Sequence, residues 1–241
     1  MEHILLQRLT STQASSRILL EILAQTRNRN KINVDEIASK ARATVHNVKQ
    51  TLNEVLPDKT KTSETLIDPE TRMKIALEIA RHGLGNTAKT LTWQEFETFT
   101  GQCLQLAGFE TVKGIIAHGQ GRKWQIDLIG KKGSMLLGFD CKHWHSSYSP
   151  GRLQNAAQHQ KDALFAMLND PKCRKKFPEQ KLSALPLILT LLEPQARILD
   201  EAVVVPLEKL SDFLNGVTPY STDFPFIESI TSPLENPMSA R

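Results

Sequence analysis

Two aspartates and one lysine near the middle of the chain have the types and spacing of a site that acts on phosphodiesters. Asp127 lies in one short apolar run, and Asp140 and Lys142 lie in the next. Side chains two residues apart on a strand share a face, roughly 7 Å apart, so Asp140 and Lys142 are expected to point the same way. A turn over residues 130–134 makes the two runs antiparallel, which lets Asp127 lie close to Asp140.

Two neighbouring carboxylates repel each other, and a cation between them relieves the repulsion. Oxygen ligands suit Mg²⁺, which keeps several of its waters and binds substrate phosphate. Such an ion stabilises the charge that develops on a phosphate and lowers the pKa of an attacking water. Lys142 can orient or deprotonate that water, or neutralise charge on the phosphorane. The pattern therefore predicts a Mg²⁺ or Mn²⁺ site and no organic cofactor.

A second candidate metal site consists of Cys141, His143 and His145, which alternate along the same run. Three ligands at this spacing, without a convincing fourth, fall short of the pattern of a zinc centre. Because Cys141 lies on the face opposite the aspartate and the lysine, we expect it to pack in the core. His143 and Trp144 are expected at the end of the strand, near the mouth of the site.

The segment before these strands supplies a further acid. Its apolar residues recur at the spacing of one helical face: Phe96, Phe99, Cys103 and Ala107. Glu95 and Glu97 flank that face symmetrically at roughly 100° per residue, so periodicity leaves both open as the acid of the site.

The elements that must position these residues follow the order helix, three strands, helix, strand, and a further strand and helix come after them. The expected strands span residues 110–116, 125–129, 135–142, 185–192 and 202–206, and the expected helices span residues 93–107, 153–168 and 207–214. Glycines at positions 114, 119 and 121 are expected to bracket a loop that holds His118, Arg122 and Lys123.

This order of elements, with Asp127, the Asp140-Cys141-Lys142 run and an acid on the preceding helix, resembles the PD-(D/E)xK nuclease superfamily. The Phe96-Glu97 pair, eleven residues before Gly108-Phe109, is similar to the opening helix of Mrr-type restriction endonucleases and archaeal Holliday-junction resolvases. The resemblance covers about residues 92–214. It implies a restriction-endonuclease-like α/β fold, with a mixed sheet flanked by helices, and divalent-metal-dependent DNA cleavage.

The resemblance also implies a role for each matching residue. Asp127 and Asp140 would be metal ligands, Glu97 a supporting ligand, and Lys142 the catalytic lysine. The sequence departs from the superfamily pattern in having Ile126 before Asp127, where the name of the superfamily has a proline. Asp140 stands where Mrr-like members often have Gln or Glu. Only the spacing of the family favours Glu97 as the helix acid.

The N-terminal part predicts an all-α module. Ser16 is expected to cap one helix, and Asn33 or Asp35 to begin a second, short one. Residues 42–44 then form a turn, with Thr44 as the cap of a third helix that ends at residue 56.

The short helix, the turn and the helix after it resemble the helix-turn-helix of winged-helix domains. Residues 57–64 would then be a linker or a wing. In this interpretation the polar residues of the third helix face a DNA groove: His46, Asn47, Lys49 and Gln50. The alternative is a small helical bundle that mediates dimerisation or packs on the catalytic part.

Further DNA contacts are expected from Arg122 and Lys123 and from Gln158. In the superfamily, the helix that corresponds to residues 153–168 lies beside the active site, so Gln158 can reach a phosphate. A solvated helix face is the alternative for Gln158.

Length and composition bound these hypotheses. With 241 residues, 40% hydrophobic and 23% charged, the chain has the composition of a globular protein and can form two domains. We expect a helix-turn-helix (winged-helix-like) domain over 1–66, a nuclease domain over 67–217 with a connecting helix at 67–91, and a proline-rich tail over 218–241. The net charge of +4 is compatible with nucleic acid as a partner.

Three scattered cysteines argue against a disulfide framework and favour the cytoplasm, and no apolar stretch predicts a membrane span. The predicted function is a DNA endonuclease in restriction or in DNA repair and recombination. A homodimer is plausible because cutting two strands needs two sites. The alternative is a non-catalytic DNA-binding or scaffolding protein with a degenerate nuclease fold.

Overall fold

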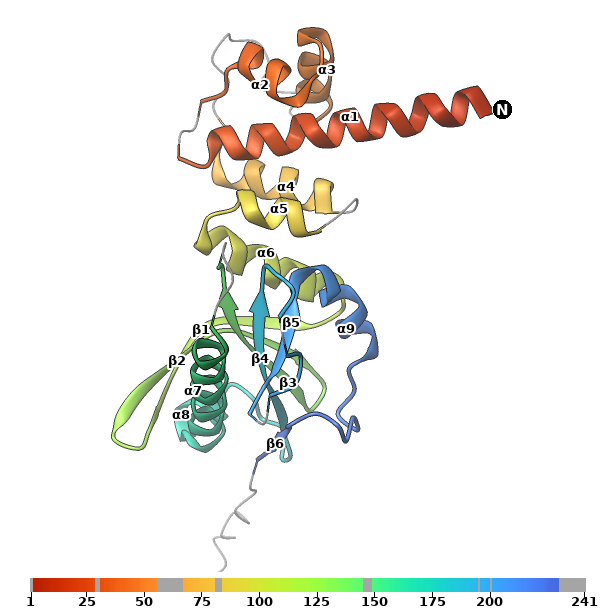
Figure 1. The fold of residues 1–241 in the computed structure, drawn as a ribbon. Helices are drawn as coiled ribbons and strands as arrows, with labels where there is room; N and C mark the ends of the chain where they lie inside the picture. Colours follow the sequence, from red (N-terminus) through yellow and green to blue (C-terminus); the bar gives the residue numbers. More distant parts are fainter. Residues whose placement is uncertain are drawn as a thin grey trace, which may run out of the picture. The chain divides into compact units, whose positions relative to one another are not determined.

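The computed structural model describes residues 2–28, 31–55, 67–80, 84–144, 149–194, 196–199 and 201–229 (Figure 1). The contacts divide the chain into two compact units, Met1–Phe99 and Thr100–Arg241. The division falls inside helix α6 (Trp93–Leu106). The first unit is built of helices and the second is α/β. None of the described helices has the length and the apolar character needed to cross a bilayer.

The helices of the first unit are α1 (Glu2–Thr26), α2 (Val34–Ala41), α3 (Val45–Val55), α4 (Pro69–Ala80), α5 (Leu84–Thr90) and the start of α6. The predicted short helix, turn and following helix are present as α2, residues 42–44 and α3. The side chain of Asn33 accepts hydrogen bonds from the backbone N–H groups of Asp35 and Glu36, so it is the N-cap of α2. The hydroxyl of Thr44 accepts from the N–H of Asn47 at 3.1 Å and begins α3.

One prediction for this unit was wrong. Ser16 does not begin a helix but lies inside α1, which starts at Glu2. Residues 2–15 contain neither glycine nor proline, so nothing ends the helix before Ser16. Residues 85–87 lie in α5, because one glycine in the first turn does not prevent a helix. The predicted linker or wing at 57–64 lies outside the described residues.

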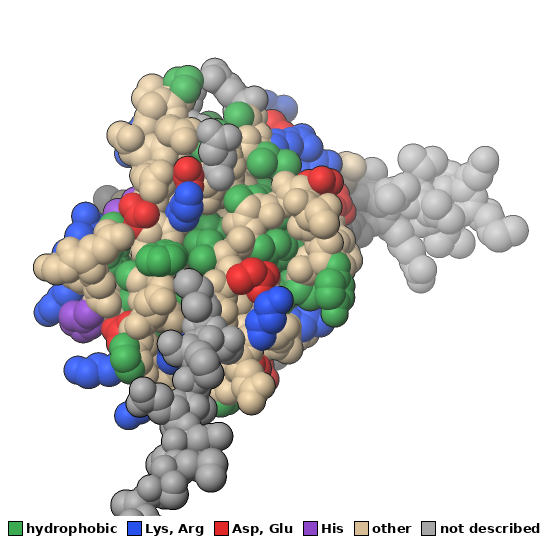
Figure 2. Space-filling model, turned by 90° about the horizontal axis from the view of Figure 1, so that it is seen from below, with side chains coloured by type: hydrophobic (Ala, Val, Ile, Leu, Met, Phe, Trp, Pro, Cys, Tyr) green, Lys and Arg blue, Asp and Glu red, His purple; other side chains and the backbone are tan. Residues whose placement is uncertain are grey.

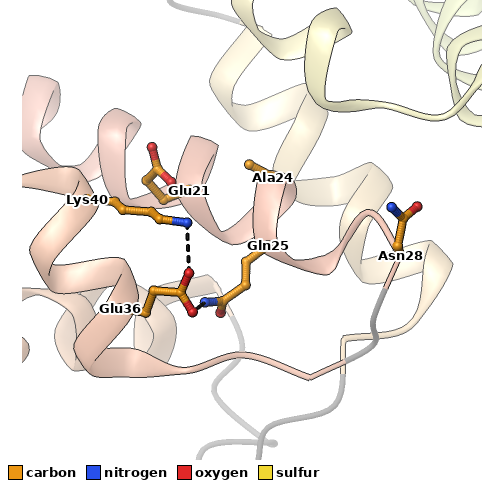
Figure 3. A pocket seen from close by; sticks show the side chains of 6 residues that line it. All are labelled: Glu21, Ala24, Gln25, Asn28, Glu36 and Lys40. Carbon is orange, nitrogen blue, oxygen red and sulfur yellow. Dashed lines mark hydrogen bonds and ion pairs between the residues drawn. The ribbon is translucent and has the colours of Figure 1, made fainter.

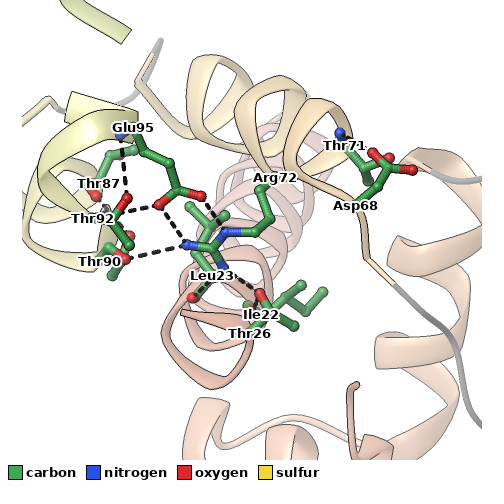
Figure 4. A network of polar contacts seen from close by, with 10 residues as sticks. All are labelled: Ile22, Leu23, Thr26, Asp68, Thr71, Arg72, Thr87, Thr90, Thr92 and Glu95. Carbon is green, nitrogen blue, oxygen red and sulfur yellow. Dashed lines mark hydrogen bonds and ion pairs between the residues drawn. The ribbon is translucent and has the colours of Figure 1, made fainter. Parts of the chain in front are cut away.

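A buried arginine joins the helices of the first unit (Figure 4). Arg72 on α4 is only 3% exposed. Its guanidinium donates to both oxygens of Glu95, at 2.6 and 3.1 Å, and to the carbonyl oxygen of Leu23 at 2.8 Å. It also donates to the hydroxyl of Thr26 and to the carbonyl oxygen of Thr90. One side chain therefore ties α1, α4, the end of α5 and the start of α6 together.

These bonds explain why the division of the chain differs from the predicted domain boundaries. Residues 67–91 were assigned to the nuclease domain as a connecting helix, with the boundary after residue 66. Arg72 lies on α4 and bonds to α1, so α4 and α5 belong with the helical unit. The apolar periodicity of α4 alone could not show which unit buries it.

The second unit is organised around a mixed sheet in the order β1-β2-β3-β4-β5. The strands are β1 (Glu110–Gly119), β2 (Arg122–Lys132), β3 (Met135–Lys142), β4 (Ser183–Thr190), β5 (Val203–Pro206) and β6 (Ile227–Glu228). β1, β2 and β3 are antiparallel, β3, β4 and β5 are parallel, and β6 pairs antiparallel with the start of β4. All eight residues of β4 are buried, as expected for a central parallel strand. The expected α/β class with a mixed sheet flanked by helices is confirmed at this level.

Helices cover both faces of the sheet. They are α7 (Pro150–Asn169), the short α8 (Pro171–Arg174), the turn η1 (Leu207–Lys209) and α9 (Leu210–Gly216), with the end of α6. A Cβ added at Gly138 of β3 would lie 2.5 Å from Leu164, so only glycine lets α7 approach here. Leu104 and Phe109 pack against Gly130, on the opposite face of the sheet.

Two further predictions are corrected in this unit. The segment that contains His118, Arg122 and Lys123 is not a loop, because β1 runs to Gly119 and β2 begins at Arg122 across a two-residue turn. The predicted extended tail is packed in its first part. β6 pairs with β4, and the hydroxyl of Ser229 accepts from the N–H of Leu182 at 2.8 Å. Residues 230–241 lie outside the described part.

We expect Arg72→Met to lower the free energy of unfolding by about 3 kcal/mol, because it leaves the carboxylate of Glu95 buried without its cation. Urea denaturation followed by circular dichroism measures this loss. Lys74→Met on the same helix is the matched control, since Lys74 pairs with Glu70 while both side chains are at least 70% exposed. Equal losses for the two variants would contradict the role assigned to Arg72.

Candidate active site

The sheet forks where the two predicted aspartates lie. β2 and β3 pair from Lys132 and Met135 as far as Leu128 and Phe139, and no further. Beyond this point β2 continues with β1 alone, and β3 continues with β4 alone. Asp127 and Asp140 are the next residues on the two branches. A fork leaves backbone groups without ladder partners, and such positions favour polar side chains that can replace the missing bonds.

A local irregularity sets the direction of Asp127. The ladder between β1 and β2 omits the pair Gly114–Asp127, and Gly114 has a φ of +60°, which favours glycine. Ile126 and Ile129 both lie in the core cluster that contains Leu164 of α7. Strict alternation would put residues three apart on opposite faces. The alternation therefore shifts at Asp127.

The structure brings Asp127, Asp140 and Lys142 together. The carboxylate of Asp127 accepts a hydrogen bond from the N–H of Cys141 at 3.1 Å, across the fork. The ammonium of Lys142 lies 2.8 Å from Oδ2 of Asp140. The carboxyl groups of Asp127 and Asp140 are close enough to affect each other's pKa. Two carboxyl groups and one ammonium group thus converge at the fork from two strands.

The electrostatics of this cluster favour an added positive charge. Burial raises the pKa of Asp127, and the neighbouring Asp140 carboxylate raises it further, against the hydrogen bond from Cys141. Burial also raises the pKa of Asp140, and this effect outweighs the opposing charge of Lys142. Two acids whose ionised forms are both disfavoured can be stabilised by a shared proton or by a cation.

The donor set fits a hard cation that keeps much of its water. Mg²⁺ binds through one or two carboxylates together with substrate phosphates, so the pair Asp127 and Asp140 is sufficient for it. Within the described ranges, no group of three or more His, Cys, Asp and Glu side chains is arranged to hold a metal ion. Cys141 is buried, as expected, and His145 of the alternative zinc set lies outside the described residues.

The two acids of α6 have different surroundings. Burial raises the pKa of Glu95, but hydrogen bonds from Arg72 and Thr92 outweigh it, and the pKa lies below its ordinary value. Glu95 accepts from the N–H of Thr92 at 2.8 Å, and Thr92 accepts in return from Glu95 at 3.2 Å, which is a capping box. The Thr-x-x-Glu spacing was present in the sequence and could have assigned Glu95 to the cap. Glu97, which is half-buried in the first unit, remains the candidate for the helix acid.

The predicted DNA contacts are all exposed side chains. Arg122 and Lys123 are exposed at the start of β2, and His46 and Lys49 are exposed on α3 of the first unit. Gln158 is exposed on α7, where its amide donates to Asp162 at 3.1 Å. That bond supports the alternative of a solvated helix face for Gln158.

Two tryptophans near the fork carry cations on their rings, and these contacts were not anticipated. The guanidinium of Arg122 lies 3.7 Å from the ring centre of Trp124, whose ring lies 5.2 Å from that of His159 on α7. Burial lowers the pKa of His159, and the positive charges of Arg122 and Lys142 lower it further. Sequence reasoning missed His159 because the periodicity of α7 does not reveal which strand a helical residue meets.

Beside the other branch of the fork, the guanidinium of Arg152 lies 4.3 Å from the ring centre of Trp144. The ammonium of Lys142 lies 5.9 Å from the same ring. The Arg-x-Trp spacing at residues 122–124 could have predicted the contact between Arg122 and the ring of Trp124. The pairing of residues 144 and 152 depends on the start of α7 and had no such signal.

The first unit contains a hollow of about 260 Å³, lined by Glu21, Ala24, Gln25, Asn28, Glu36 and Lys40 (Figure 3). Its polar groups satisfy one another, since Glu36 accepts from Gln25 at 2.8 Å and pairs with Lys40 at 2.7 Å. On the face drawn in Figure 2, acidic and basic side chains are interspersed with hydrophobic ones. The charged side chains of the hollow are therefore better neutralised by their neighbours than the two carboxylates at the fork.

A protein of Archaeoglobus fulgidus described as uncharacterized is similar to this chain, with 22% identity over 138 residues. The similarity spans 57% of this chain and 100% of that protein. No protein-family model and no solved structure matches the chain.

We expect Asp127→Asn to stabilise the metal-free protein at neutral pH by on the order of 1 kcal/mol. An aspartate whose pKa is raised by folding costs stability as the pH rises from its unfolded value, about 3.9, through its folded value. The asparagine removes this cost and can still accept from Cys141. Urea denaturation in EDTA at about pH 7 and at about pH 4 should show a gain that is larger at the higher pH.

Asp170→Asn is the control of opposite sign. Hydrogen bonds from the backbone N–H groups of His118 and Lys172 lower the pKa of Asp170, so its ionised form stabilises the fold above the unfolded pKa. This variant should be less stable than the wild type at neutral pH. A loss of stability in both variants would show that the Asp127 carboxylate is not disfavoured by its surroundings.

Proposed function

We propose that this chain is a divalent-metal-dependent DNA endonuclease of the PD-(D/E)xK type. The observation that carries the proposal is the convergence of Asp127, Asp140 and Lys142 at the fork between β2 and β3. The resemblance in sequence assigns catalytic roles to the same three residues. The mixed sheet with helices on both faces is compatible with the fold that the resemblance implies.

In this proposal Asp127 and Asp140 hold Mg²⁺ or Mn²⁺, with Glu97 as a supporting ligand. Such an ion supplies electrostatic stabilisation to the scissile phosphate and lowers the pKa of the attacking water. Burial of the two carboxylates strengthens their attraction for a cation, because few waters compete for their charge. Lys142, fixed by its ion pair with Asp140, orients the water for in-line attack and offsets the negative charge that gathers on the phosphorus centre.

The helical unit is proposed as the DNA-binding module. Its α2, turn and α3 follow the order of a helix-turn-helix, and α3 exposes His46 and Lys49, which would meet a groove of the duplex. We further propose a cytoplasmic protein that acts as a homodimer in restriction or in DNA repair and recombination. The free thiols of all three cysteines support a reducing compartment.

The test is cleavage of a supercoiled plasmid in Mg²⁺ or Mn²⁺. Asp140→Asn and Lys142→Met should each reduce the rate at least about a hundredfold, because each removes a charge that acts on the transition state. Both should retain the circular dichroism spectrum and the DNA affinity of the wild type. Glu97→Gln should slow cleavage. The main effect of Glu95→Gln should instead be a lower unfolding temperature.

Lys131→Met provides the matched control for Lys142. Lys131 is also a lysine of this sheet paired with carboxylates, those of Glu179 at 2.7 Å and Glu110 at 3.5 Å, but it lies at the other end of β2. This variant should cut at the wild-type rate. Full activity in Asp140→Asn or Lys142→Met would refute the assignment, and DNA binding by a wild type that never cuts would favour the scaffolding alternative.

A further inference from the structure

We propose that Arg122 and Arg152, each held on a tryptophan ring, bind backbone phosphates of the substrate strand beside the carboxylate pair. The inference rests on the proposed nuclease function, and it names the part of the substrate that must be present: phosphates that extend beyond the one being cut. It thus deepens that function by naming groups of this chain that would hold the substrate strand.

The two arginines lie on the two branches that leave the fork. Arg122 precedes Asp127 by five residues on β2, a distance of roughly 16 Å along a strand. Arg152 is in the first turn of α7 and lies over Trp144, which follows Asp140 by four residues. Because β2 and β3 are antiparallel, both branches leave the carboxylate pair towards the same end of the sheet. The acids are thus at the vertex and an arginine is beside each branch.

The rings fix these cations without neutralising them. Trp124 is 4% exposed and donates its indole N–H to the carbonyl oxygen of Gly119 at 3.1 Å, so it is a rigid support. Trp144 packs against the core cluster that contains Leu153 and Ile188. A guanidinium over an indole face gains about 0.5–1 kcal/mol at an exposed site, and its N–H groups stay available around its edge.

Other arginines of this unit are engaged differently. Arg174 donates to the carbonyl oxygen of Glu179, and Arg197 pairs with the carboxylate of Glu193. Within the described part of the chain, neither Arg122 nor Arg152 has an ion pair with a carboxylate. Both are exposed. An exposed guanidinium that is held in place but not neutralised is the group that best recognises a phosphate.

Two further side chains contact the tryptophan rings that hold the arginines. His159 contacts the ring of Trp124, and burial lowers its pKa, with the positive charges of Arg122 and Lys142 lowering it further. Lys142 lies near the ring of Trp144 as well as beside Asp140. A polyanion bound by Arg122 and Arg152 supplies negative charge beside these groups, whereas a neutral ligand would not.

The experiment measures binding of a fluorescein-labelled DNA duplex to the full chain by anisotropy, in EDTA and over a series of NaCl concentrations. Arg122→Ala and Arg152→Ala should each weaken binding and reduce the slope of log Kd against log salt by about 0.9, the value for one lost phosphate contact. The double variant should lose about twice as much.

Arg197→Ala is the matched control, because it removes the same charge from an exposed arginine of the same unit that already has a carboxylate partner. Its slope should equal that of the wild type. The proposal is overturned if the two arginine variants keep the wild-type slope, or if Arg197→Ala changes the slope as much as they do. Since the assay needs no cleavage, reduced slopes in a protein that does not cut would retain this inference while rejecting the nuclease.

Discussion

The fork between β2 and β3 is the constraint on which the rest of the second unit depends. Where the ladder between β2 and β3 ends, the N–H of Cys141 donates to the carboxylate of Asp127. That bond draws an acid towards Asp140, and Lys142 compensates only part of the resulting negative charge. The sheet thus places two carboxyl groups together where burial disfavours their ionised forms, which costs stability at neutral pH.

Stability elsewhere must offset this cost. Gly138 lets Leu164 of α7 come close to the sheet beside the fork, and β4 buries all of its side chains. In the helical unit the guanidinium of Arg72 stabilises the packing of the helices through hydrogen bonds to Glu95, Leu23 and Thr26. The hydrogen-bonded network around Arg72 thus differs from the carboxyl pair at the fork, whose ionised forms are disfavoured by burial.

Much of this arrangement was predictable from local patterns. The bounds of β3, the cap at Thr44 and the closeness of Asp127 and Asp140 follow from alternation, capping chemistry and a short turn between strands. The shift of alternation at Asp127 was not predictable, because it depends on a positive φ in the neighbouring strand. The membership of α4 in the helical unit depends on Arg72, and the stacks on Trp124 and Trp144 depend on the path of α7. Such long-range contacts produce no periodic pattern in the sequence.

If the carboxylates at the fork form a divalent cation site, calorimetric titration with Mn²⁺ will detect binding there. The wild type should bind Mn²⁺ with measurable heat, and Asp127→Asn, which retains the hydrogen bond from Cys141, should bind it much more weakly or not at all. Asp170→Asn, which alters an aspartate away from the fork, should bind like the wild type. Equal Mn²⁺ binding by the wild type and Asp127→Asn, or no binding by either, would contradict the account.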